Sequence, residues 1–349
     1  MTGTGSSRWE GPSGAEDSRP GWRRSGLLRP LVGVAFLVWL LWWYPLEAFT
    51  DAFGAVDGRS VAAALGIGLA TTVLCAARWV LVARGVGLCL PWLRAVGDYY
   101  RAVFLNAVLP VGVLGDAHRA VSHGRYAGDL ARGVRAVVLE RMAGQLVLAG
   151  VCAAGLFTLP AALLGPGLLA VAASVAVFAV VALVVAIGWV VGRRRGSRWW
   201  RALSATVADT RAGLFTLTTG PGVVLLSLAA LAGHLALFLV AARAAGTTAA
   251  TLALLPLLVL ALVAMGVPAN VGGWGPREAV TALAFGAAGL GAEQGLTVSV
   301  AYGLLALVAA LPGGLVLVWR LLRVEHVQVP GEDLDQVRQQ VPALGRGGS

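Results

Sequence analysis

The hydrophobic positions of this chain fall into long uninterrupted runs rather than into an alternating pattern. A helix needs about 20 mostly apolar residues to cross the roughly 30 Å hydrocarbon core of a bilayer. Runs of that length occur at Leu27–Leu46, Val61–Val82, Val134–Leu156, Leu168–Val191, Val223–Ala242 and Leu296–Trp319. The pattern therefore predicts about six full transmembrane helices.

Two further apolar segments, Trp92–Ser122 and Thr251–Leu290, are interrupted by Pro, Gly and charged residues. Each lies between two predicted spans, so the order span, broken segment, span occurs twice. We expect each broken segment to be a re-entrant hairpin and the two halves to form an inverted repeat, as in many transporters. Alternatively, Thr251–Met265 and Pro276–Leu290 are two short full spans, which gives eight transmembrane helices.

The composition agrees with a polytopic, all-α membrane protein. Of the 349 residues, 58% are hydrophobic and only 13% are charged, against roughly 25% charged in an average soluble domain. The mean hydropathy of +0.80 also excludes a disordered or disulfide-scaffold chain. We expect residues 26–325 to form one transmembrane domain, and residues 1–25 and 326–349 to be disordered cytoplasmic tails.

The distribution of charge predicts the orientation. The net charge is +10 and all 27 basic residues are arginines. By the positive-inside rule, arginine-rich connections lie in the cytoplasm, which places both termini there and the protein in the cell membrane. The first broken segment then enters from the cytoplasmic side and the second from the outer side. The arginines assigned inside are Arg19, Arg23, Arg24, Arg29, Arg78, Arg84, Arg94, Arg101, Arg119, Arg125, Arg132, Arg135, Arg193, Arg194, Arg195, Arg198, Arg201, Arg211, Arg320 and Arg323.

The two broken segments share a plan of a proline, a glycine-rich turn, and a helix start that bears opposite charges. The first runs from Pro110 to Ala120 and the second from Pro268 to Ala279. Pro276 suits the first position of a helix, where no amide hydrogen is required. We expect a half-helix to start near mid-membrane in each hairpin, with the breaks formed by Gly112, Gly115, Gly272, Gly273 and Gly275.

A buried helix N-terminus attracts anions because its amide groups lack partners and carry partial positive charge. Arg119 lies beside one expected helix start and Arg277 beside the other, so both positions are candidate phosphate sites. In the alternative interpretation, Asp116 and Glu278 cap these helix ends and the arginines only neutralise them.

Ionised side chains inside the predicted membrane region must face one another or a hydrated cavity, because each costs about 2.5–3.5 kcal/mol at the centre of a span. We expect Glu140 to pair with Arg119 or Arg277. Asn106 and Asn270 are expected to satisfy backbone groups freed by the breaks. The candidate substrate-binding residues are Asp116, Arg119, Glu140, Arg141, Arg277, Glu278, Trp274 and Asn270.

No metal, cofactor or nucleic-acid partner is predicted. Cys75, Cys89 and Cys152 are too scattered for a metal cluster. The five-residue spacing of His118 and His123 does not place both on one helix face. His234, within a predicted span, is interpreted as a structural residue.

Four motifs, in this order, resemble the flippase-like membrane domain of the lysylphosphatidylglycerol synthases, also called multiple peptide resistance factors. They are Gly115-Asp116-x-x-Arg119-Ala120, preceded by Asn106-x-x-Leu109-Pro110; Glu140-Arg141-x-x-Gly144; Gly273-Trp274-Gly275-x-Arg277-Glu278-Ala279; and Leu311-Pro312-Gly313-Gly314. The resemblance covers about residues 30–325. Pro276 departs from it, because the family more often has an aliphatic residue there.

The resemblance implies a lipid translocase that moves a phospholipid, an aminoacylated lipid or a lipid-linked sugar between leaflets. In that family a soluble aminoacyltransferase domain makes the lipid; here only a short polar segment follows the last span, so we expect no lysyl transfer and no catalytic residues. The expected partners are membrane lipids and a separate lipid-modifying transferase. The alternative is a membrane enzyme or accessory subunit in lipid or lipid-linked glycan modification.

Overall fold

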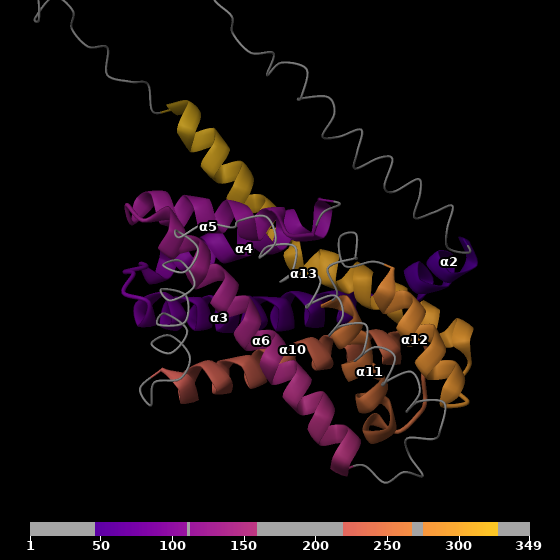
Figure 1. The fold of residues 1–349 in the computed structure, drawn as a ribbon. Coiled ribbons are helices and arrows are strands. Elements are labelled where there is room, and N and C mark those ends of the chain that lie inside the picture. The colour runs from indigo at the N-terminus through magenta and orange to yellow at the C-terminus, as the bar shows by residue number, and fades with distance from the viewer. Residues whose placement is uncertain (1–45, 110–111, 159–218, 267–274, 327–349) are drawn as a thin grey trace, which may run out of the picture. The chain divides into compact units, whose positions relative to one another are not determined.

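The computed structural model describes residues 46–109, 112–158, 219–266 and 275–326. The chain divides into two compact units, Met1–Trp43 and Tyr44–Ser349, and all of these residues lie in the second. Every regular element that they form is an α-helix (Figure 1). In chain order the helices are α2 (Leu46–Ala55), α3 (Gly58–Gly85), α4 (Trp92–Val108), α5 (Leu114–Tyr126), α6 (Leu130–Thr158), α10 (Gly220–Ala244), α11 (Thr251–Met265), α12 (Pro276–Ala287) and α13 (Ala292–His326).

Among the described residues, α3, α6, α10 and α13 are long and apolar enough to cross a membrane. They confirm four of the predicted spans. The predicted spans Leu27–Leu46 and Leu168–Val191 lie outside the described residues, except for Leu46. Large apolar side chains on these helices face outward, with Leu225 68% and Leu315 73% exposed. Surfaces of this kind are stable against lipid chains, so the fold is that of a multi-pass, all-α membrane protein.

The sequence fixes the start of α3 through a reciprocal cap. The Asp57 carboxylate accepts a hydrogen bond from the Ser60 backbone N–H at 2.8 Å, and the Ser60 hydroxyl accepts one from the Asp57 N–H at 3.0 Å. This capping box satisfies two amide groups at the helix end. The bond from the Ser60 N–H also lowers the pKa of Asp57 below its usual value. Before this cap lies α2, which lies between two predicted spans and was not predicted from the sequence.

Both broken segments consist of two helices with an interruption between them, as predicted. The first contains α4 and α5, and the second contains α11 and α12. Pro276 is the first residue of α12, which confirms the expected helix start. The four helices have 17, 13, 15 and 12 residues. At 1.5 Å per residue they are about 18–26 Å long, shorter than the roughly 30 Å hydrocarbon core.

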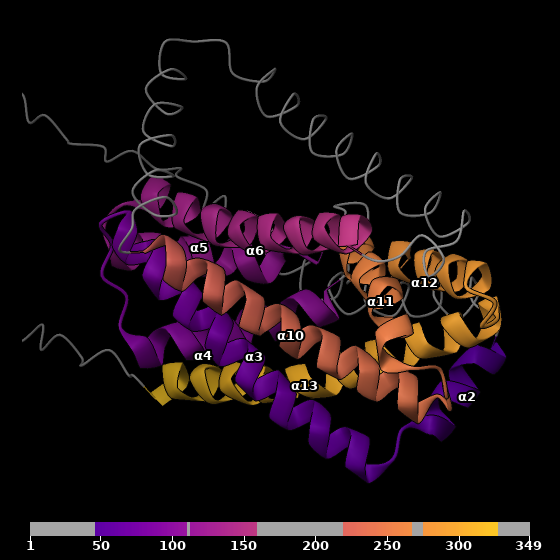
Figure 2. The ribbon, with the colours of Figure 1, turned by 90° about the horizontal axis from the view of Figure 1, so that it is seen from below.

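Short connections gather the helix ends at opposite ends of the helix assembly. Residues 86–91 join α3 to α4, and residues 127–129 join α5 to α6. The Arg94 guanidinium near the start of α4 lies 4.0 Å from the ring centroid of Tyr126 at the end of α5, so these four helix ends lie together. At the other end of the assembly, residues 245–250 join α10 to α11 and residues 288–291 join α12 to α13. Helices α3 and α10 pack side by side and run in opposite directions (Figures 1 and 2). The two broken segments therefore enter the assembly from opposite ends.

The contacts among these eight helices are related in pairs. If α3, α4, α5 and α6 are exchanged with α10, α11, α12 and α13, the contact between α3 and α10 maps onto itself, and each other extensive contact among these helices coincides with another. For example, the contact between α4 and α13 corresponds to that between α11 and α6, and the contact between α5 and α6 to that between α12 and α13. The helix α2, which contacts α13, lies outside this scheme.

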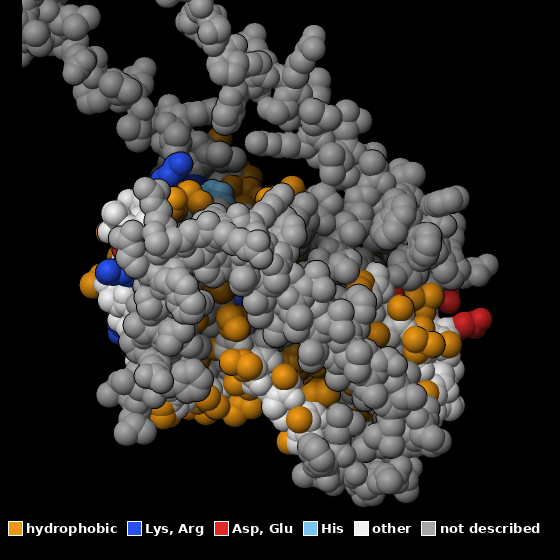
Figure 3. All heavy atoms as spheres, viewed as in Figure 1, with side chains coloured by type: hydrophobic (Ala, Val, Ile, Leu, Met, Phe, Trp, Pro, Cys, Tyr) orange, Lys and Arg blue, Asp and Glu red, His pale blue; other side chains and the backbone are white. Residues whose placement is uncertain are grey.

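On the face shown in Figure 3, the visible charged side chains lie mainly toward two edges of the described helices. In Figure 3 the visible arginines lie toward the end where α5 meets α6, and acidic side chains project at the opposite edge, near α12. Apolar side chains occupy much of the described surface between these ends. The same separation of charge led the sequence analysis to assign the first end to the cytoplasm.

Two glycines of the Leu311-Pro312-Gly313-Gly314 motif let α13 approach α4 closely. A Cβ atom on Gly313 would overlap the backbone of Tyr100, and one on Gly314 would lie 3.0 Å from the Phe104 ring. Near this contact, Arg320 Nη1 donates a hydrogen bond to Asp98 Oδ1 at 2.6 Å. The motif noticed in the sequence thus allows α13 to pack closely against α4.

Candidate functional site

Glu140, on α6, is the centre of a buried cluster of charged side chains. Its Oε1 accepts hydrogen bonds from Arg78 Nε at 3.0 Å, Arg78 Nη2 at 2.5 Å and the Tyr99 hydroxyl at 3.2 Å. Its Oε2 accepts one from Arg119 Nη2 at 2.9 Å. Glu140 is 0% exposed, and a carboxylate so deeply buried requires such partners. Of the two predicted partners, Arg119 and Arg277, the structure shows Arg119.

The role of Arg78 was missed by the sequence analysis, which assigned this residue to a cytoplasmic connection. That assignment was wrong: Arg78 lies within α3 and is 6% exposed. Besides Glu140, it donates to the Ser227 hydroxyl of α10 at 3.1 Å. Gly144 leaves space for its guanidinium, because a Cβ there would lie 3.0 Å from Arg78 Nη1. This role could have been predicted from the position of Arg78 inside the predicted span Val61–Val82, because an ionised residue within a span requires a partner.

Arg119, on α5, is enclosed by the cluster and is 1% exposed. Its Nη2 also donates to Asp116 Oδ1 at 2.9 Å. The guanidinium lies over the rings of Trp79 and Tyr99, with 4.6 and 4.3 Å between its central carbon and the ring centroids. Cation–π contacts of this kind favour a desolvated arginine. Through these contacts Arg119 holds α5 against α3, α4 and α6.

Asp116 connects the buried part of the cluster to Arg141. Its Oδ2 accepts a hydrogen bond from Asn106 Nδ2 at 3.0 Å and forms an ion pair with Arg141 Nη2 at 2.5 Å. The Arg141 side chain is 46% exposed, whereas that of Asp116 is 14% exposed. The cluster of Arg78, Arg119, Arg141, Asp116 and Glu140 contains three guanidinium groups and two carboxylates, so it carries one excess positive charge.

The starts of both half-helices are capped by side chains. At α5, Asn106 Oδ1 accepts a hydrogen bond from the Gly115 N–H at 2.7 Å, which confirms the role expected of Asn106. At α12, Glu278 Oε2 accepts one from the Gly275 N–H at 2.7 Å. Gly112 (φ 62°) and Gly275 (φ 106°) adopt the left-handed backbone that favours glycine. The capping predicted as the alternative is therefore present for Glu278, while Asn106 caps the other helix.

Gly115 contributes close packing rather than an unusual backbone angle. A Cβ atom there would overlap the backbone of Ala102 on α4. The glycine thus allows the start of α5 to lie directly against α4, within reach of Asn106. Gly115 is consequently part of the break as predicted, but its role is steric.

A second buried cluster lies at the start of α12. Arg277 forms an ion pair with Glu278, and its Nε donates to the Ser299 hydroxyl of α13 at 3.0 Å. The two charged residues are 3% and 0% exposed. The Arg277 guanidinium lies 5.1 Å from the ring centroid of Tyr302, which stacks on Phe238 with 4.2 Å between ring centroids. These contacts join α12 to α13 and α10.

A third charged group, missed by the sequence analysis, joins α4 to α13. Asp98 is 1% exposed and accepts hydrogen bonds from Arg101 at 3.2 Å and Arg320 at 2.6 Å. Arg94 lies 3.8 Å away. Only the spacing of Arg94, Asp98 and Arg101 on one helix face was visible in the sequence; the partner on α13 was not.

A cavity of about 390 Å³ lies between the first half of the described helices, α3 to α6, and the second half, α10 to α13. Its volume is within the ~300–1,000 Å³ typical of ligand sites. Helices α3, α4 and α6 of the first half and α10 to α13 of the second contribute to its wall. Its charged wall residues, among those the structure describes, are Arg78, Arg141 and Arg277. The carboxylates that pair with these arginines lie behind them.

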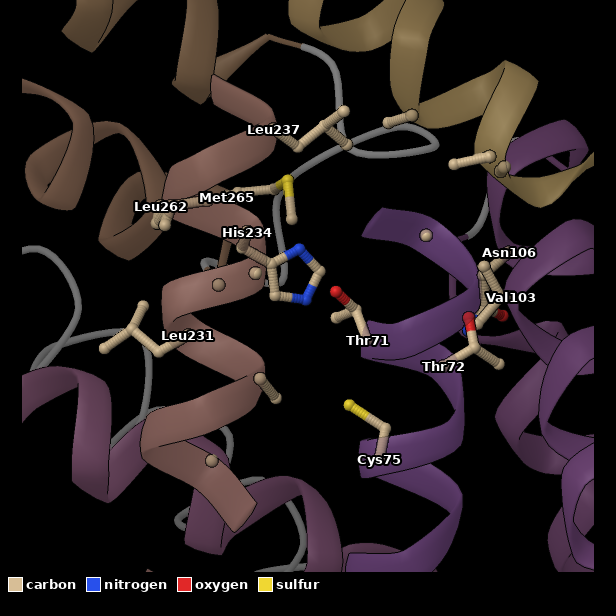
Figure 4. A pocket seen from close by; sticks show the side chains of 18 of the residues that line it. Thr71, Thr72, Cys75, Val103, Asn106, Leu231, His234, Leu237, Leu262 and Met265 are labelled. Atoms are coloured by element: carbon tan, nitrogen blue, oxygen red, sulfur yellow. The ribbon is translucent and has the colours of Figure 1, made fainter. Parts of the chain in front are cut away.

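Uncharged polar side chains complete the wall. In Figure 4, Thr71 of α3 and His234 of α10 project toward the space between these two helices, and Cys75 lies one turn below Thr71. Asn106, Gln145, Ser227 and Tyr302 also line the cavity. The His234 Nδ1 atom lies 3.5 Å from the Tyr302 hydroxyl.

The structure thus gathers six of the eight candidate substrate-binding residues into the first and second clusters. Arg141 and Arg277 line the cavity, whereas Arg119, Glu140 and Glu278 are enclosed by protein. Asn270, Trp274, Gly272 and Gly273 lie outside the described residues, as do Pro110 and Pro268. Substrate binding by these residues stays a prediction.

In the described part of the chain, no group of three or more His, Cys, Asp or Glu side chains is arranged to hold a metal ion. His118 Nδ1 lies 3.5 Å from Arg101 Nη2. His123 is buried edge-on against Trp79, with 5.5 Å between ring centroids.

Comparison with known proteins agrees with the membrane fold and with the family resemblance found in the sequence. The model of one family, described as the lysylphosphatidylglycerol synthase TM region, matches residues 28–314. No curated protein and no solved structure matches the chain. The match covers most of the sequence and includes both charged clusters and the cavity between them. The chain therefore belongs to the family of lysylphosphatidylglycerol synthase transmembrane regions, and it is a membrane protein with a lipid-related function.

Proposed function

We propose that this protein is a lipid translocase, in which a phosphate-bearing headgroup crosses through the cavity while its acyl chains stay in the bilayer. The observation that carries the proposal is the composition of the cavity wall. Three arginines from three helices line it, and arginine binds phosphate through a planar pair of donors. The exposed apolar helix surfaces provide the lipid-facing boundary.

The arrangement of the halves supports alternating exposure of such a cavity to the two leaflets. The contacts among eight helices match in pairs under exchange of the halves, and α3 and α10 run in opposite directions. Inverted repeats with sites at the repeat interface are typical of transporters that expose one site to each side in turn. We therefore propose that α4–α5 and α11–α12 are re-entrant hairpins of an inverted repeat in the cell membrane, with both termini cytoplasmic.

Arg141 and Arg277 are the proposed headgroup contacts, one from each half. Arg141 keeps nearly half of its side chain exposed, and Arg277 borders the cavity while it pairs with Glu278. Arg119 was also predicted to bind phosphate. Its enclosure between Trp79, Tyr99 and Glu140 instead favours a positioning role.

An enzymatic function receives less support from the site. A general base must be able to reach the proton that it removes. Glu140 is fully enclosed by Arg78, Arg119 and Tyr99, and the Asp116 oxygens are occupied by Arg119, Arg141 and Asn106. We propose a separate lipid-modifying transferase as the enzyme that acts on the cargo.

The translocase proposal is tested by reconstitution into liposomes that contain a fluorescent phospholipid in both leaflets. We expect a membrane-impermeant reductant to quench only the outer-leaflet dye in protein-free liposomes, and to quench both leaflets progressively when the protein exchanges them. Liposomes with an unrelated polytopic protein control for leakage. Exchange equal to that control, from protein that is folded and inserted, would reject the proposal.

A further inference from the structure

The charged groups on the cavity wall all have the same sign in the described part of the chain. Arg78, Arg141 and Arg277 line the cavity, while Glu140 and Glu278 are 0% exposed behind them. An anionic group that enters meets cations directly. A cationic group meets guanidinium groups of like charge before any carboxylate, which opposes its binding.

The carboxylates nearest to the cavity have their acceptor positions filled by protein donors. Glu140 accepts bonds from Arg78, Tyr99 and Arg119. The two oxygens of Glu278 accept from Arg277, from Ser299 and from the backbone at the start of α12. A headgroup ammonium would have to replace these donors in order to bind.

Aromatic rings at the cavity are also engaged with protein groups. Ammonium ligands bind well to the faces of aromatic rings, and Tyr99 and Tyr302 both line the cavity. Arg119 lies over the Tyr99 ring. Tyr302 stacks on Phe238 and also lies beneath the Arg277 guanidinium. These rings already interact with cations of the protein.

The uncharged part of the wall suits hydroxyl groups. Thr71, Asn106, Gln145, Ser227 and His234 line the cavity from four different helices. Their hydroxyl, amide and imidazole groups both donate and accept hydrogen bonds. Figure 4 shows Thr71 and His234 directed toward the same space. Polar groups so placed around the arginines match a ligand with a phosphate and neighbouring alcohols.

We infer that the cavity selects lipids whose headgroup is a phosphodiester of an uncharged polyol, such as glycerol or inositol, over lipids whose headgroup carries an amine. The inference rests on the proposed translocase function and names the class of cargo. The phosphate contacts Arg141 and Arg277, and the hydroxyls contact the uncharged wall. An amine-bearing headgroup presents its positive charge to the same arginines.

The test measures binding and leaflet exchange separately, with the same set of fluorescent lipids. The set consists of phosphatidylglycerol, phosphatidylinositol, phosphatidylethanolamine and lysylphosphatidylglycerol. We expect phosphatidylglycerol and phosphatidylinositol to bind and exchange at least about tenfold better than lysylphosphatidylglycerol. Glycerol 3-phosphate and inorganic phosphate are added as competitors. Competition by these soluble ions at the concentrations at which lipid binds would mean that the site recognises free phosphate rather than a lipid.

A pair of variants tests whether the cavity charge causes the selectivity. Gln145 lines the cavity and is exposed. Gln145→Glu places a carboxylate in the wall, so we expect it to narrow the preference for phosphatidylglycerol over lysylphosphatidylglycerol by about tenfold. Gln145→Met removes the amide without adding charge and serves as the matched control, with an expected preference closer to that of the wild type.

The outcomes separate this inference from the proposed function. Equal binding and exchange of all four lipids would overturn the selectivity and leave the translocase function standing. Selective binding without exchange would reject the translocase function and support the selectivity. A preference for lysylphosphatidylglycerol in either measurement would overturn the inference.

Discussion

Replacing Glu140 by glutamine is expected to lower the free energy of unfolding by about 3–5 kcal/mol, because removing one member of a buried ion pair leaves an uncompensated charge. Glu140 is the shared partner of Arg78 and Arg119. The substitution preserves the shape of the side chain but leaves these two buried guanidinium groups without their carboxylate. The change is measured by thermal or denaturant unfolding of the protein in detergent.

Two further variants show whether charge causes this loss. Glu293→Gln removes an exposed carboxylate at the start of α13, so its stability should be close to that of the wild type. The double variant Glu140→Gln/Arg78→Gln removes one charge of each sign, and we expect it to recover part of the stability lost in the single variant. If Glu140→Gln unfolds like the wild type, the cluster does not depend on this carboxylate.

Replacing Arg141 by glutamine is expected to slow lipid exchange by about 10–100-fold, the equivalent of one charge-assisted hydrogen bond of about 1.5–3 kcal/mol. The protein should still fold, because the Arg141 side chain is 46% exposed and not enclosed like Arg119. The exchange rate is measured in the fluorescent-lipid liposomes. Arg132→Gln is the matched control, since Arg132 is a 42% exposed arginine of the same helix that is not part of the cavity wall.

Arg277 requires a paired substitution, because it forms a buried ion pair with Glu278. The double variant Arg277→Gln/Glu278→Gln removes both charges and leaves neither unbalanced. We expect it to slow exchange as strongly as Arg141→Gln. Exchange at the wild-type rate in both the Arg141 variant and this double variant would remove the arginines from the headgroup path.

Local signals in the sequence were sufficient to predict the four long spans that the structure describes and the interruptions between the shorter helices. Runs of about 20 apolar residues identify a span without knowledge of its neighbours. Pro276 and Gly275 predicted the start of α12 because their backbone preferences are local. The prediction that ionised groups inside the membrane region face one another also depended only on their cost in lipid, and the two clusters agree with it.

Partners distant in the chain could not be identified in this way. Arg78 and Glu140 are separated by 62 positions, and Asp98 and Arg320 by 222. Their pairing depends on how α3, α4, α6 and α13 pack, which no local pattern specifies. For the same reason, Arg119 and Arg141 were both predicted from the sequence as substrate-binding residues, although packing encloses the first and exposes the second.

We propose that the two broken segments enter the membrane from opposite sides and bring their charged clusters to one cavity. This proposal is tested most directly by determining which side of the membrane each connection faces. Native Cys89 is exposed in the connection between α3 and α4. Single-cysteine variants at Ala127, Thr248 and Ala288, all exposed positions, report on the other three connections once the native cysteines have been replaced.

These variants are treated with a membrane-impermeant maleimide in intact cells and in inverted vesicles. We expect Cys89 and Ala127→Cys to react only from the cytoplasmic side, and Thr248→Cys and Ala288→Cys to react only from the outer side. Reaction of all four positions from one side, or of the two connections of a single hairpin from different sides, would contradict the proposal.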